Sequence, residues 1–465
     1  MKRCLFLWLG CFFLNNLLYA QHLDPTFGVN GIAYVPIKSV NSKCYAFVLD
    51  PAGNSYLAGN IVSKSGKQNA VVSKLDAQGK LDPTFGTNGT LYLDSSVYSL
   101  YCADIAWDKM GHLLLSVVYG NNVNERFLTV EKITTSGAYV TDFGTSGMVD
   151  ASYGFSDYRI VQSESGTIFT GNGQKIDVSG KTVKGINAYH AGINVYKNSR
   201  LFTGYNNRIS NTDTNGTSIS NFADNGSLTL ANGSISTMLV NNSGSLFVAE
   251  NTSSSTNDTC NLYKITSAGK LVLSFGNNGQ KAILFPQGKA TVLSSLLLND
   301  KEMVLAGYSS LTNTGSFILA KLDTNGMYVP SFGSNGQIVI NVGDGNAAVP
   351  YDMEVDTKGN LFIAGIAYQG GNSIMTLAKL TQDFTTELTQ LLDNETSISI
   401  FPNPAKDAHF LVRANEGDVL NVKLVTLDGR EESYSTSDVY TQLKGILLVK
   451  VITTKGTFVR KIDVQ

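Results

Sequence analysis

Side chains that act as nucleophiles, general bases or metal ligands are sparse in this sequence of 465 residues. The histidines are His22, His112, His190 and His409, and none belongs to an HExxH pattern that would bind zinc. The cysteines beyond residue 20 lack metal-site spacing, and neither a GxSxG nor a phosphate-binding GxxxxGK motif occurs. We therefore predict no catalytic residue, no metal and no cofactor, and a binding or structural role rather than an enzyme.

Tyrosines at matching positions are the residues best suited to hold a ligand. Tyr45 and Tyr351 each stand five residues before an aspartate, Asp50 and Asp356. Tyr158 occupies the same position if one gap falls in the turn that follows it. Aromatic rings gathered in one place can stack on sugars or clamp a peptide. The alternative is that these rings only pack against neighbouring strands, so their role depends on the elements that carry them.

A repeated unit carries these tyrosines. A Phe-Gly-x-x-Gly string recurs along the chain, and Phe27, Phe85 and Phe143 are 58 residues apart. The copies are FGVNG (27–31), FGTNG (85–89), FGTSG (143–147), FADNG (222–226), FGNNG (275–279) and FGSNG (332–336). Gly and Asn suit turn positions with positive φ, and we expect the Phe to pack between units. A period near 58 residues indicates a repeat architecture.

Each unit is predicted to contain four strands. Seven segments pair two apolar strands across a turn, at 46–59, 104–117, 159–171, 191–204, 237–250, 294–307 and 352–365. The first strand of each pair is expected to be an inner strand buried on both faces, and a Lys-Leu-Asp strand and the Phe-Gly string complete the unit. This pattern favours an all-β fold, a seven-bladed β-propeller over residues 21–385, rather than a solenoid with capping ends. The seventh unit lacks an outer strand, which residues 23–35 would supply by pairing onto it.

The strings LDPTFGVNG (23–31) and LDPTFGTNG (81–89) resemble the delta-60 repeat, a family of units of about 55–60 residues in secreted bacterial proteins. The resemblance covers residues 21–385 and is weaker in the third and fourth units. It implies no established chemistry, so it adds to the expected fold and not to the expected site.

A second module follows a linker at residues 386–398. Residues 399–465 alternate apolar and polar side chains in VLNVKLV and LLVKVIT, which predicts a small Ig-like β-sandwich. FPNPAKD, LDGR and GTFVRKI resemble the C-terminal sorting domain of the type IX secretion system of Bacteroidota. That resemblance implies export across the outer membrane, with the secretion machinery as the partner of this module. Leu447 departs from the family, which usually has an aromatic residue there, and an ordinary Ig-like binding module is the alternative.

Residues 1–20 have the features of a secretory signal peptide. Lys2 and Arg3 precede an apolar run, and the small residue Ala20 offers a cleavage point. A membrane anchor is the alternative, but the run is short, and Cys11 lies too early in it for lipid attachment to be favoured. Cleavage leaves three cysteines that cannot all pair, so we expect buried free thiols at Cys44, Cys102 and Cys260.

Charge and loops bound the function. The formal net charge of −2 favours neither nucleic acid nor an anionic membrane as a partner, and no transmembrane segment is expected in the mature chain. We predict a protein that is secreted or held on the outer-membrane cell surface. Long polar loops on one propeller face, together with Tyr45, Tyr158 and Tyr351, would bind a glycan or a protein. A glycan hydrolase or lyase and a passive spacer are the alternatives. The long loops are 60–68, 94–101, 251–259 and 308–316.

Overall fold

The chain divides into two compact units, one ending at Gln382 and one beginning at Asp383. The computed structural model describes residues 23–37, 41–93, 98–120, 126–153, 158–171, 173–183, 193–196, 200–230, 233–252, 259–286, 288, 290–309, 315–381, 398–405, 408–414, 418–426, 431–453 and 456–464. The predicted signal peptide, and the predicted linker apart from its last residue, lie outside these ranges. The described residues are all-β, and none of them belongs to a helix that is long and apolar enough to cross a membrane.

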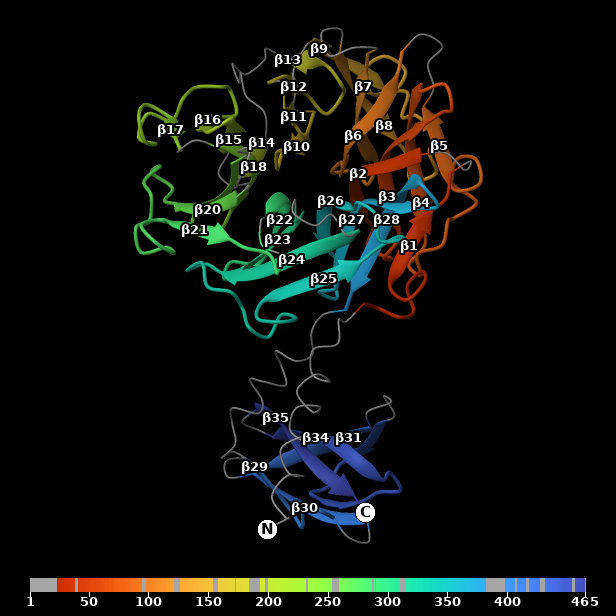
Figure 1. Ribbon diagram of the computed structural model, residues 1–465, viewed down its shortest axis with the longest axis vertical. Helices are drawn as coiled ribbons and strands as arrows, with labels where there is room; N and C mark the ends of the chain where they lie inside the picture. Colours follow the sequence, from red (N-terminus) through yellow and green to blue (C-terminus); the bar gives the residue numbers. More distant parts are fainter. Residues whose placement is uncertain are drawn as a thin grey trace, which may run out of the picture. The chain divides into compact units, whose positions relative to one another are not determined.

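The first unit contains seven four-stranded antiparallel sheets within its described residues, arranged around a common centre (Figure 1). The first two sheets are β2 (Asn41–Leu49), β3 (Ser55–Val62), β4 (Gln68–Leu75) and β5 (Thr90–Leu93), then β6 (Leu100–Trp107), β7 (Leu113–Tyr119), β8 (Phe127–Ile133) and β9 (Met148–Tyr153). The next two are β10 (Ile160–Gln162), β11 (Ile168–Thr170), β12 (Lys175–Ile176) and β13 (Thr182–Val183), then β14 (Ile193–Tyr196), β15 (Arg200–Tyr205), β16 (Arg208–Asp213) and β17 (Ser227–Thr229).

The remaining sheets follow the same plan. The fifth and sixth are β18 (Ser234–Val240), β19 (Leu246–Thr252), β20 (Thr259–Ile265) and β21 (Gln280–Ile283), then β22 (Thr291–Asn299), β23 (Glu302–Tyr308), β24 (Ser316–Asp323) and β25 (Gln337–Asn341). The seventh is β26 (Val349–Val355), β27 (Leu361–Gln369), β28 (Asn372–Leu380) and β1 (Ile32–Val35). The first two strands of every sheet are an antiparallel pair at one of the predicted hairpins.

The first strand of the chain belongs to the last sheet of the unit. β1 pairs antiparallel with β28, with Ile32 opposite Ala378. Before β1, Asp24 forms an ion pair with Lys379, with 2.9 Å between Asp24 Oδ2 and Lys379 Nζ. β2, the first strand of the first sheet, contacts β26 on one side and β6 on the other. The N-terminal segment therefore supplies the outer strand that the seventh repeat lacks.

The hydrophobic core lies between neighbouring sheets, where the Phe-Gly string is anchored. Phe27 is 1% exposed and shares a cluster with Leu57 of the first sheet and Phe362 of the seventh. The Gly28 backbone N–H donates a 2.8 Å hydrogen bond to the carbonyl of Gln78 on the next sheet. Gly28 has a φ of 54°, and a Cβ there would lie 2.3 Å from the Ile32 carbonyl oxygen, which favours glycine. Ala223 takes the matching position in FADNG, with a φ of 43°. The string is thus an anchor between sheets, as the sequence predicted.

Burial differs from the prediction in one respect. The second strand of the first sheet, β3, is buried along nearly its whole length, whereas the inner strand β2 alternates buried and half-buried residues. β7 and β27 are likewise more fully buried than β6 and β26. The prediction that inner strands are buried on both faces was wrong. Second strands lie between two other strands of their sheet and are covered on both faces by neighbouring sheets, while the inner strands border the centre.

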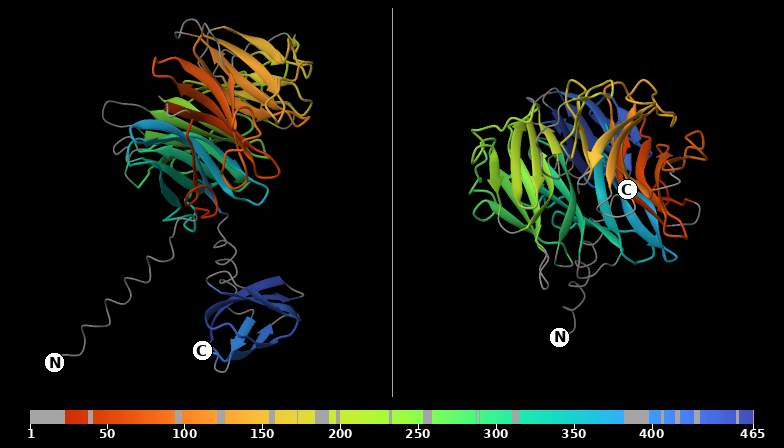
Figure 2. Two further views of the ribbon diagram at one scale, coloured as in Figure 1. Left: turned by 90° about the vertical axis from the view of Figure 1, so that its right-hand side faces the viewer. Right: turned by 90° about the horizontal axis from the view of Figure 1, so that it is seen from above.

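The second unit contains seven strands in its described residues, in two sheets around one core (Figure 2). One sheet is β29 (Ile398–Phe401), β30 (His409–Ala414) and β33 (Asp438–Tyr440). The other is β32 (Glu431–Tyr434), β31 (Val419–Thr426), β34 (Gly445–Thr453) and β35 (Gly456–Val464). Leu447, the residue that departs from the sorting-domain pattern, lies in β34 and is fully buried in this core. This buried position is apolar, and both leucine and an aromatic residue meet that requirement.

Candidate functional site

Four tyrosines form a continuous row on the innermost strands of neighbouring sheets. The ring of Tyr45 on β2 lies 5.5 Å from that of Tyr351 on β26 and 5.7 Å from that of Tyr101 on β6. The Tyr101 ring in turn lies 5.9 Å from that of Tyr158, just before β10. Interplanar angles of 63° to 84° make each contact edge-to-face, the arrangement that aromatic quadrupoles favour. The structure therefore brings together all three tyrosines predicted from the sequence.

Tyr101 is the member of the row that the sequence prediction missed. Tyr45 and Tyr351 stand at β-bulges, where the register shifts between Cys44 and Ala46 and between Pro350 and Asp352. On β6 the bulge position holds Ala103, and the ring comes from two residues earlier. Residues two apart on a strand point to the same side, so this alternation was the available signal.

Tyr158 matches the other two positions without the gap that the sequence comparison required. It lies five residues before Ser163. The Ser163 N–H donates to the Thr167 carbonyl, and the Ser163 carbonyl accepts the Gly166 N–H. Asp50 makes the corresponding two backbone bonds in the first sheet. A serine therefore takes the place of the aspartate that begins this turn in other units.

The tyrosine row is half-buried, and a guanidinium lies beside it. Burial raises the pKa of Tyr45 to about 12, with a further contribution from Tyr351 and an opposing one from Arg126. Burial also raises the pKa of Tyr101. The guanidinium carbon of Arg126 lies 5.9 Å from the centre of the Tyr101 ring, within cation–π range. The hydroxyls of Tyr45 and Tyr101 therefore stay protonated at neutral pH.

Three carboxyl groups lie on the same inner strands as the tyrosines. Burial raises the pKa of Asp104 to about 7, of Asp352 to about 6 and of Glu354 to about 8. Such pKa values often mark catalytic acids, but buried structural carboxyl groups have them too, and the hydrogen-bond partners distinguish the two cases. Two of them had a signal in the sequence. Each is an aspartate four residues before the aspartate that begins the turn, in DIAWD (104–108) and DMEVD (352–356).

Their hydrogen bonds link neighbouring inner strands. Asp352 Oδ2 accepts the Phe47 N–H at 3.0 Å, and Glu354 Oε2 accepts the Leu49 N–H at 2.8 Å, both from the seventh sheet to the first. Asp104 Oδ2 accepts the Ile160 N–H at 2.8 Å, from the second sheet to the third. The other oxygen of each aspartate accepts the N–H of the residue that follows it. Both aspartates are thus committed to holding the backbone.

The inner strands of the fifth and sixth sheets carry smaller side chains at the matching positions. The bulge positions there hold Ser236 and Leu293. The hydroxyls of Thr237 and Ser295 lie 2.6 Å apart and link these two strands as the carboxylates do elsewhere. Among the described residues, the aromatic row therefore lies on the side of the centre formed by the seventh, first, second and third sheets.

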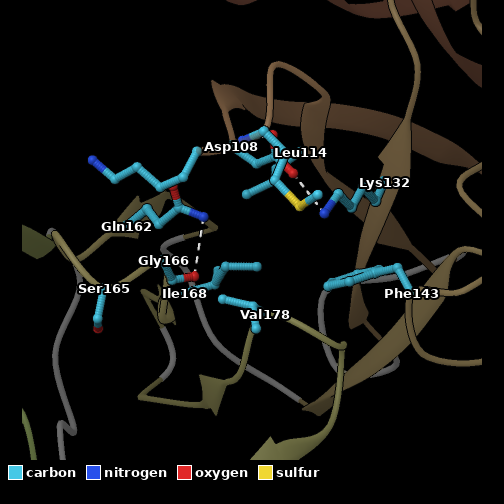
Figure 3. A pocket seen from close by; sticks show the side chains of 11 residues that line it. Asp108, Leu114, Lys132, Phe143, Gln162, Ser165, Gly166, Ile168 and Val178 are labelled. Carbon is cyan, nitrogen blue, oxygen red and sulfur yellow. Dashed lines mark hydrogen bonds and ion pairs between the residues drawn. The ribbon is translucent and has the colours of Figure 1, made fainter.

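A small pocket between the second and third sheets has a structural explanation (Figure 3). Its volume is about 50 Å³, far below the several hundred Å³ of ordinary ligand pockets. Leu114 lies opposite Lys132 there, whereas Tyr56 lies opposite Lys74 in the first sheet. A leucine in place of the aromatic ring leaves the space unfilled.

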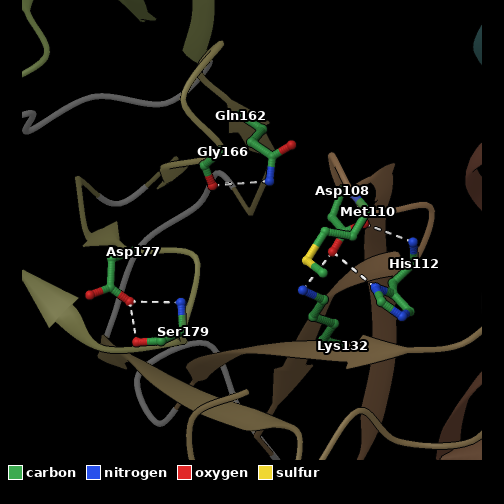
Figure 4. A network of polar contacts seen from close by, with 8 residues as sticks. All are labelled: Asp108, Met110, His112, Lys132, Gln162, Gly166, Asp177 and Ser179. Carbon is green, nitrogen blue, oxygen red and sulfur yellow. Dashed lines mark hydrogen bonds and ion pairs between the residues drawn. The ribbon is translucent and has the colours of Figure 1, made fainter. Parts of the chain in front are cut away.

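The charged groups beside this pocket already have partners (Figure 4). Lys132 Nζ lies 2.5 Å from Asp108 Oδ2, and both residues are buried. Asp108 Oδ1 also accepts the backbone N–H groups of Met110 and His112. Burial opposes ionisation of Asp108, but Lys132 and these N–H groups lower its pKa overall. The network stabilises a turn and leaves little capacity for a ligand.

A larger hollow of about 570 Å³ lies on the outer side of the fifth and sixth sheets, near β21 and β25. Two of its polar side chains already have a partner. The Tyr328 hydroxyl and Gln337 Nε2 both donate to the Leu284 carbonyl, at 3.2 and 2.6 Å. Lys281 lies 5.0 Å from the centre of the Tyr328 ring. None of the described residues that line this hollow is charged, so it is a weaker candidate than the tyrosine row.

The three cysteines expected to be buried free thiols are so in the structure. Cys44, Cys102 and Cys260 are free and buried, and burial raises the pKa of each thiol. Among the described residues, no group of three histidine, cysteine or acidic side chains could hold a metal ion. Of the predicted long loops, residues 94–97, 253–258 and 310–314 lie outside the described ranges.

No protein-family model and no curated protein matches the chain. In structure the chain is similar to virginiamycin B lyase from Staphylococcus aureus (TM-score 0.42, 11% identity, 75% of this chain and 98% of that chain). It is also similar to a protein of unknown function from Dyadobacter fermentans (TM-score 0.43, 12% identity, 76% and 98%). A third neighbour is the WD40 domain of SCAP from fission yeast (TM-score 0.35, 10% identity, 76% and 98%).

These neighbours have β-propeller-type folds, and they include both an enzyme and a protein of unknown function. Identities of 10% to 12% indicate nothing about the chemistry of this chain. The resemblances to the delta-60 repeat and to the type IX sorting domain stay predictions.

Proposed function

We propose that this protein is an exported binding scaffold that uses the tyrosine row to engage a glycan or a protein. The observation that carries the proposal is the row itself, four half-buried rings that meet across neighbouring sheets beside a guanidinium. A site built across several sheets is held rigidly, because the rings of Tyr45, Tyr101 and Tyr351 project from paired strands. Tyr45, Tyr101, Tyr158 and Tyr351 are the proposed contact residues.

The architecture that we propose for the first unit is a closed seven-bladed β-propeller of delta-60-type repeats, over about residues 21–385. The pairing of β1 with β28 and the contact of β2 with β26 support closure. For residues 399–465 we propose an Ig-like sandwich that directs type IX secretion, supported by FPNPAKD and GTFVRKI and by the two sheets around one core. The protein would then be secreted or held on the outer-membrane surface.

Binding is tested with the full chain on arrays of oligosaccharides and by pull-down from extracellular fractions. We expect Tyr45→Ala to lower affinity for the captured ligand at least about tenfold, because a central aromatic contact contributes more than 1 kcal/mol. Tyr205→Ala, which removes a tyrosine that is 40% exposed on β15, is the matched control. Equal binding by both variants would remove the tyrosine row as the site.

Export is tested by deleting residues 399–465. The proposal predicts that the truncated protein stays in the periplasm of a host with a type IX system while the full chain reaches the surface or the medium. Proteinase accessibility on intact cells distinguishes the two locations. Export of the truncated protein would contradict the assignment.

A second candidate is a glycan hydrolase or lyase, which one observation favours. Glu354 lies on the strand that carries Tyr351, and a carboxyl group with a pKa of about 8 can act as a general acid at neutral pH. Polysaccharide cleavage that Glu354→Gln abolishes, with binding intact, would support this function. Binding without product would exclude it.

A further inference from the structure

Two basic residues, Arg126 beside the Tyr101 ring and Lys43 two residues before Tyr45 on β2, make no ion pair among the described residues. The Arg126 guanidinium carbon lies 5.9 Å from the centre of the Tyr101 ring, and its charge also acts on the Tyr45 hydroxyl. Lys43 lies two residues before the bulge residue of β2, Tyr45. Tyr101 has the same position on β6, two residues before the bulge residue Ala103. Elsewhere, Lys74, Lys132, Lys321 and Lys379 each make an ion pair with a carboxylate. Ion pairs between a lysine and a carboxylate are therefore common among the described residues of this unit, and neither Arg126 nor Lys43 makes one there.

The tyrosine hydroxyls leave further bonding capacity. In the part of the chain that the structure describes, neither the Tyr45 nor the Tyr351 hydroxyl makes a hydrogen bond, although each can both donate and accept one. The nearby carboxyl groups of Asp352 and Asp104 are occupied by backbone N–H groups and do not reach out as acceptors. The hydroxyls of Tyr45 and Tyr351 and the Arg126 guanidinium therefore remain available to a ligand.

We propose that the tyrosine row, with Arg126 and Lys43, binds an anionic sugar of a glycan chain. The inference rests on the proposed binding function of the row and names its ligand class. The rings would pack on the apolar face of the sugar, and the free hydroxyls would bond its hydroxyl groups. The guanidinium presents a planar fork of donors that matches a carboxylate or a sulfate, and Lys43 adds a second charge.

The strand geometry favours a sugar over an extended peptide. A peptide that adds to a sheet needs an uninterrupted strand edge, and the bulges at Tyr45 and Tyr351 break the ladder of β2 and β26 at this point. A peptide anchored by apolar side chains needs pockets, and the two pockets described above lie away from the row. Flat rings with free hydroxyls suit a ring-shaped, hydroxylated ligand better.

The experiment measures binding of the full chain to four probes by calorimetry. The probes are oligogalacturonate for a carboxylate, a sulfated carrageenan oligosaccharide for a sulfate, a neutral xylo-oligosaccharide and a polyglutamate peptide. We expect one of the two anionic sugars to bind, and added salt to weaken that binding. Arg126→Gln should weaken it about tenfold or more, since a charge-assisted hydrogen bond is lost.

Matched variants separate charge from folding. Lys64→Gln removes an exposed cation from the β3–β4 turn and should leave affinity unchanged. Arg126→Lys keeps the charge and loses the fork, so it should fall between the wild type and Arg126→Gln. Melting temperatures within about 2 °C of the wild type would show that the variants are folded.

The outcomes distinguish this inference from the proposed function. Equal binding of neutral and anionic sugars, lost in Tyr45→Ala but not in Arg126→Gln, would overturn the anionic ligand and leave the binding site standing. Binding of polyglutamate alone would overturn the sugar. If neither anionic sugar binds, the inference is wrong, and the pull-down decides separately whether the row binds a protein.

Discussion

Asp104, Asp352 and Glu354 show how single residues hold the centre of the first unit together. Each side chain accepts a backbone N–H from the inner strand of the next sheet, at 2.8 to 3.0 Å. An N–H on the open edge of an inner strand has no ladder partner, so a carboxyl oxygen satisfies a donor that would otherwise be buried without a bond. Burial raises their pKa values because the charged form is poorly solvated there.

Stability should therefore fall as the pH rises. The pKa of Glu354 increases from 4.5 to about 8 on folding, so its contribution is complete below the unfolded value and is lost as the pH rises through 8. Glu354→Gln keeps an oxygen for the Leu49 N–H and cannot ionise. We expect its melting temperature to fall less than that of the wild type between about pH 5 and about pH 9.

The control for this experiment is Glu164→Gln, which changes an exposed glutamate in the β10–β11 turn. Its melting temperature should follow the wild type across the same pH range. Calorimetric melting at each pH gives both slopes. Parallel slopes for wild type and Glu354→Gln would contradict the assignment of this group, while Asp104 and Asp352 account for any slope that remains.

The buried ion pair between Lys132 and Asp108 leads to a second residue-scale prediction. Asp108→Asn leaves a buried ammonium without its counter-charge beside Phe143, whose ring centre lies 5.4 Å away. Breaking one side of a buried pair costs about 3–5 kcal/mol in the free energy of unfolding. Denaturant unfolding of this variant measures the loss. The double variant Asp108→Leu with Lys132→Met should recover much of it, and no recovery would contradict an electrostatic origin.

Among the elements, the turn that holds the Phe-Gly string does the most to join the sheets. It buries a phenylalanine between two sheets and sends one N–H to the turn of the next sheet, as Gly144 does to Ser179 at 2.8 Å. The following Asn or Ser adopts a positive φ, 51° at Asn278 and 54° at Ser146, which small polar residues tolerate. Local turn chemistry and packing between sheets therefore select the same residues.

Phe275 tests this element. It is 1% exposed, and its ring lies 6.1 Å from that of Phe247. Phe275→Ala should lower the free energy of unfolding by about 3–5 kcal/mol, because it opens a cavity in the core between the fifth and sixth sheets. Leu273→Ala lies two residues earlier in the same turn at 69% exposure and should cost under about 0.5 kcal/mol. Equal losses in urea unfolding would show that the turn is not a core anchor.

On the scale of the first unit, the N-terminal strand completes a sheet that is otherwise assembled from residues 349–380. This contact spans more than 300 positions in sequence, because Ile32 pairs with Ala378. The boundary between the seventh and first sheets, called the seam below, also contains the Asp352 and Glu354 hydrogen bonds and the Phe27 ring. A seam built from both ends of the unit makes its stability depend on all the sheets between them.

Deleting residues 21–35 should therefore destabilise the entire first unit. We expect one cooperative transition at a clearly lower temperature, relative to a chain that begins at residue 21. A synthetic peptide of residues 21–37, added in excess, should raise the transition again by mass action. Calorimetry measures both effects. A truncated chain that melts like the reference would contradict this account of the seam.

Much of this architecture was predictable because its signals are local and repeated. The hairpins, the Phe-Gly turns and the N-terminal outer strand each follow from strings that recur along the chain, and Tyr45 and Tyr351 follow from their distance to a turn aspartate. Tyr101 and Arg126 were not predictable in this way. Tyr101 comes from a shifted position on its strand. Arg126, just before β8, corresponds by register to Gln68 at the start of β4, so the repeat does not predict a charge there.

The sequence by itself determined the repeated unit, its turns and the pairing of both ends, because hydrophobic period and turn chemistry act within a few residues. Only the tertiary structure decided which side chains of different sheets meet at the centre. Whether the rings of Tyr45, Tyr101, Tyr158 and Tyr351 touch, and whether Asp352 reaches the Phe47 N–H, depends on bulges and on the spacing between sheets. Those distances are set by packing across the whole unit, which no single repeat encodes.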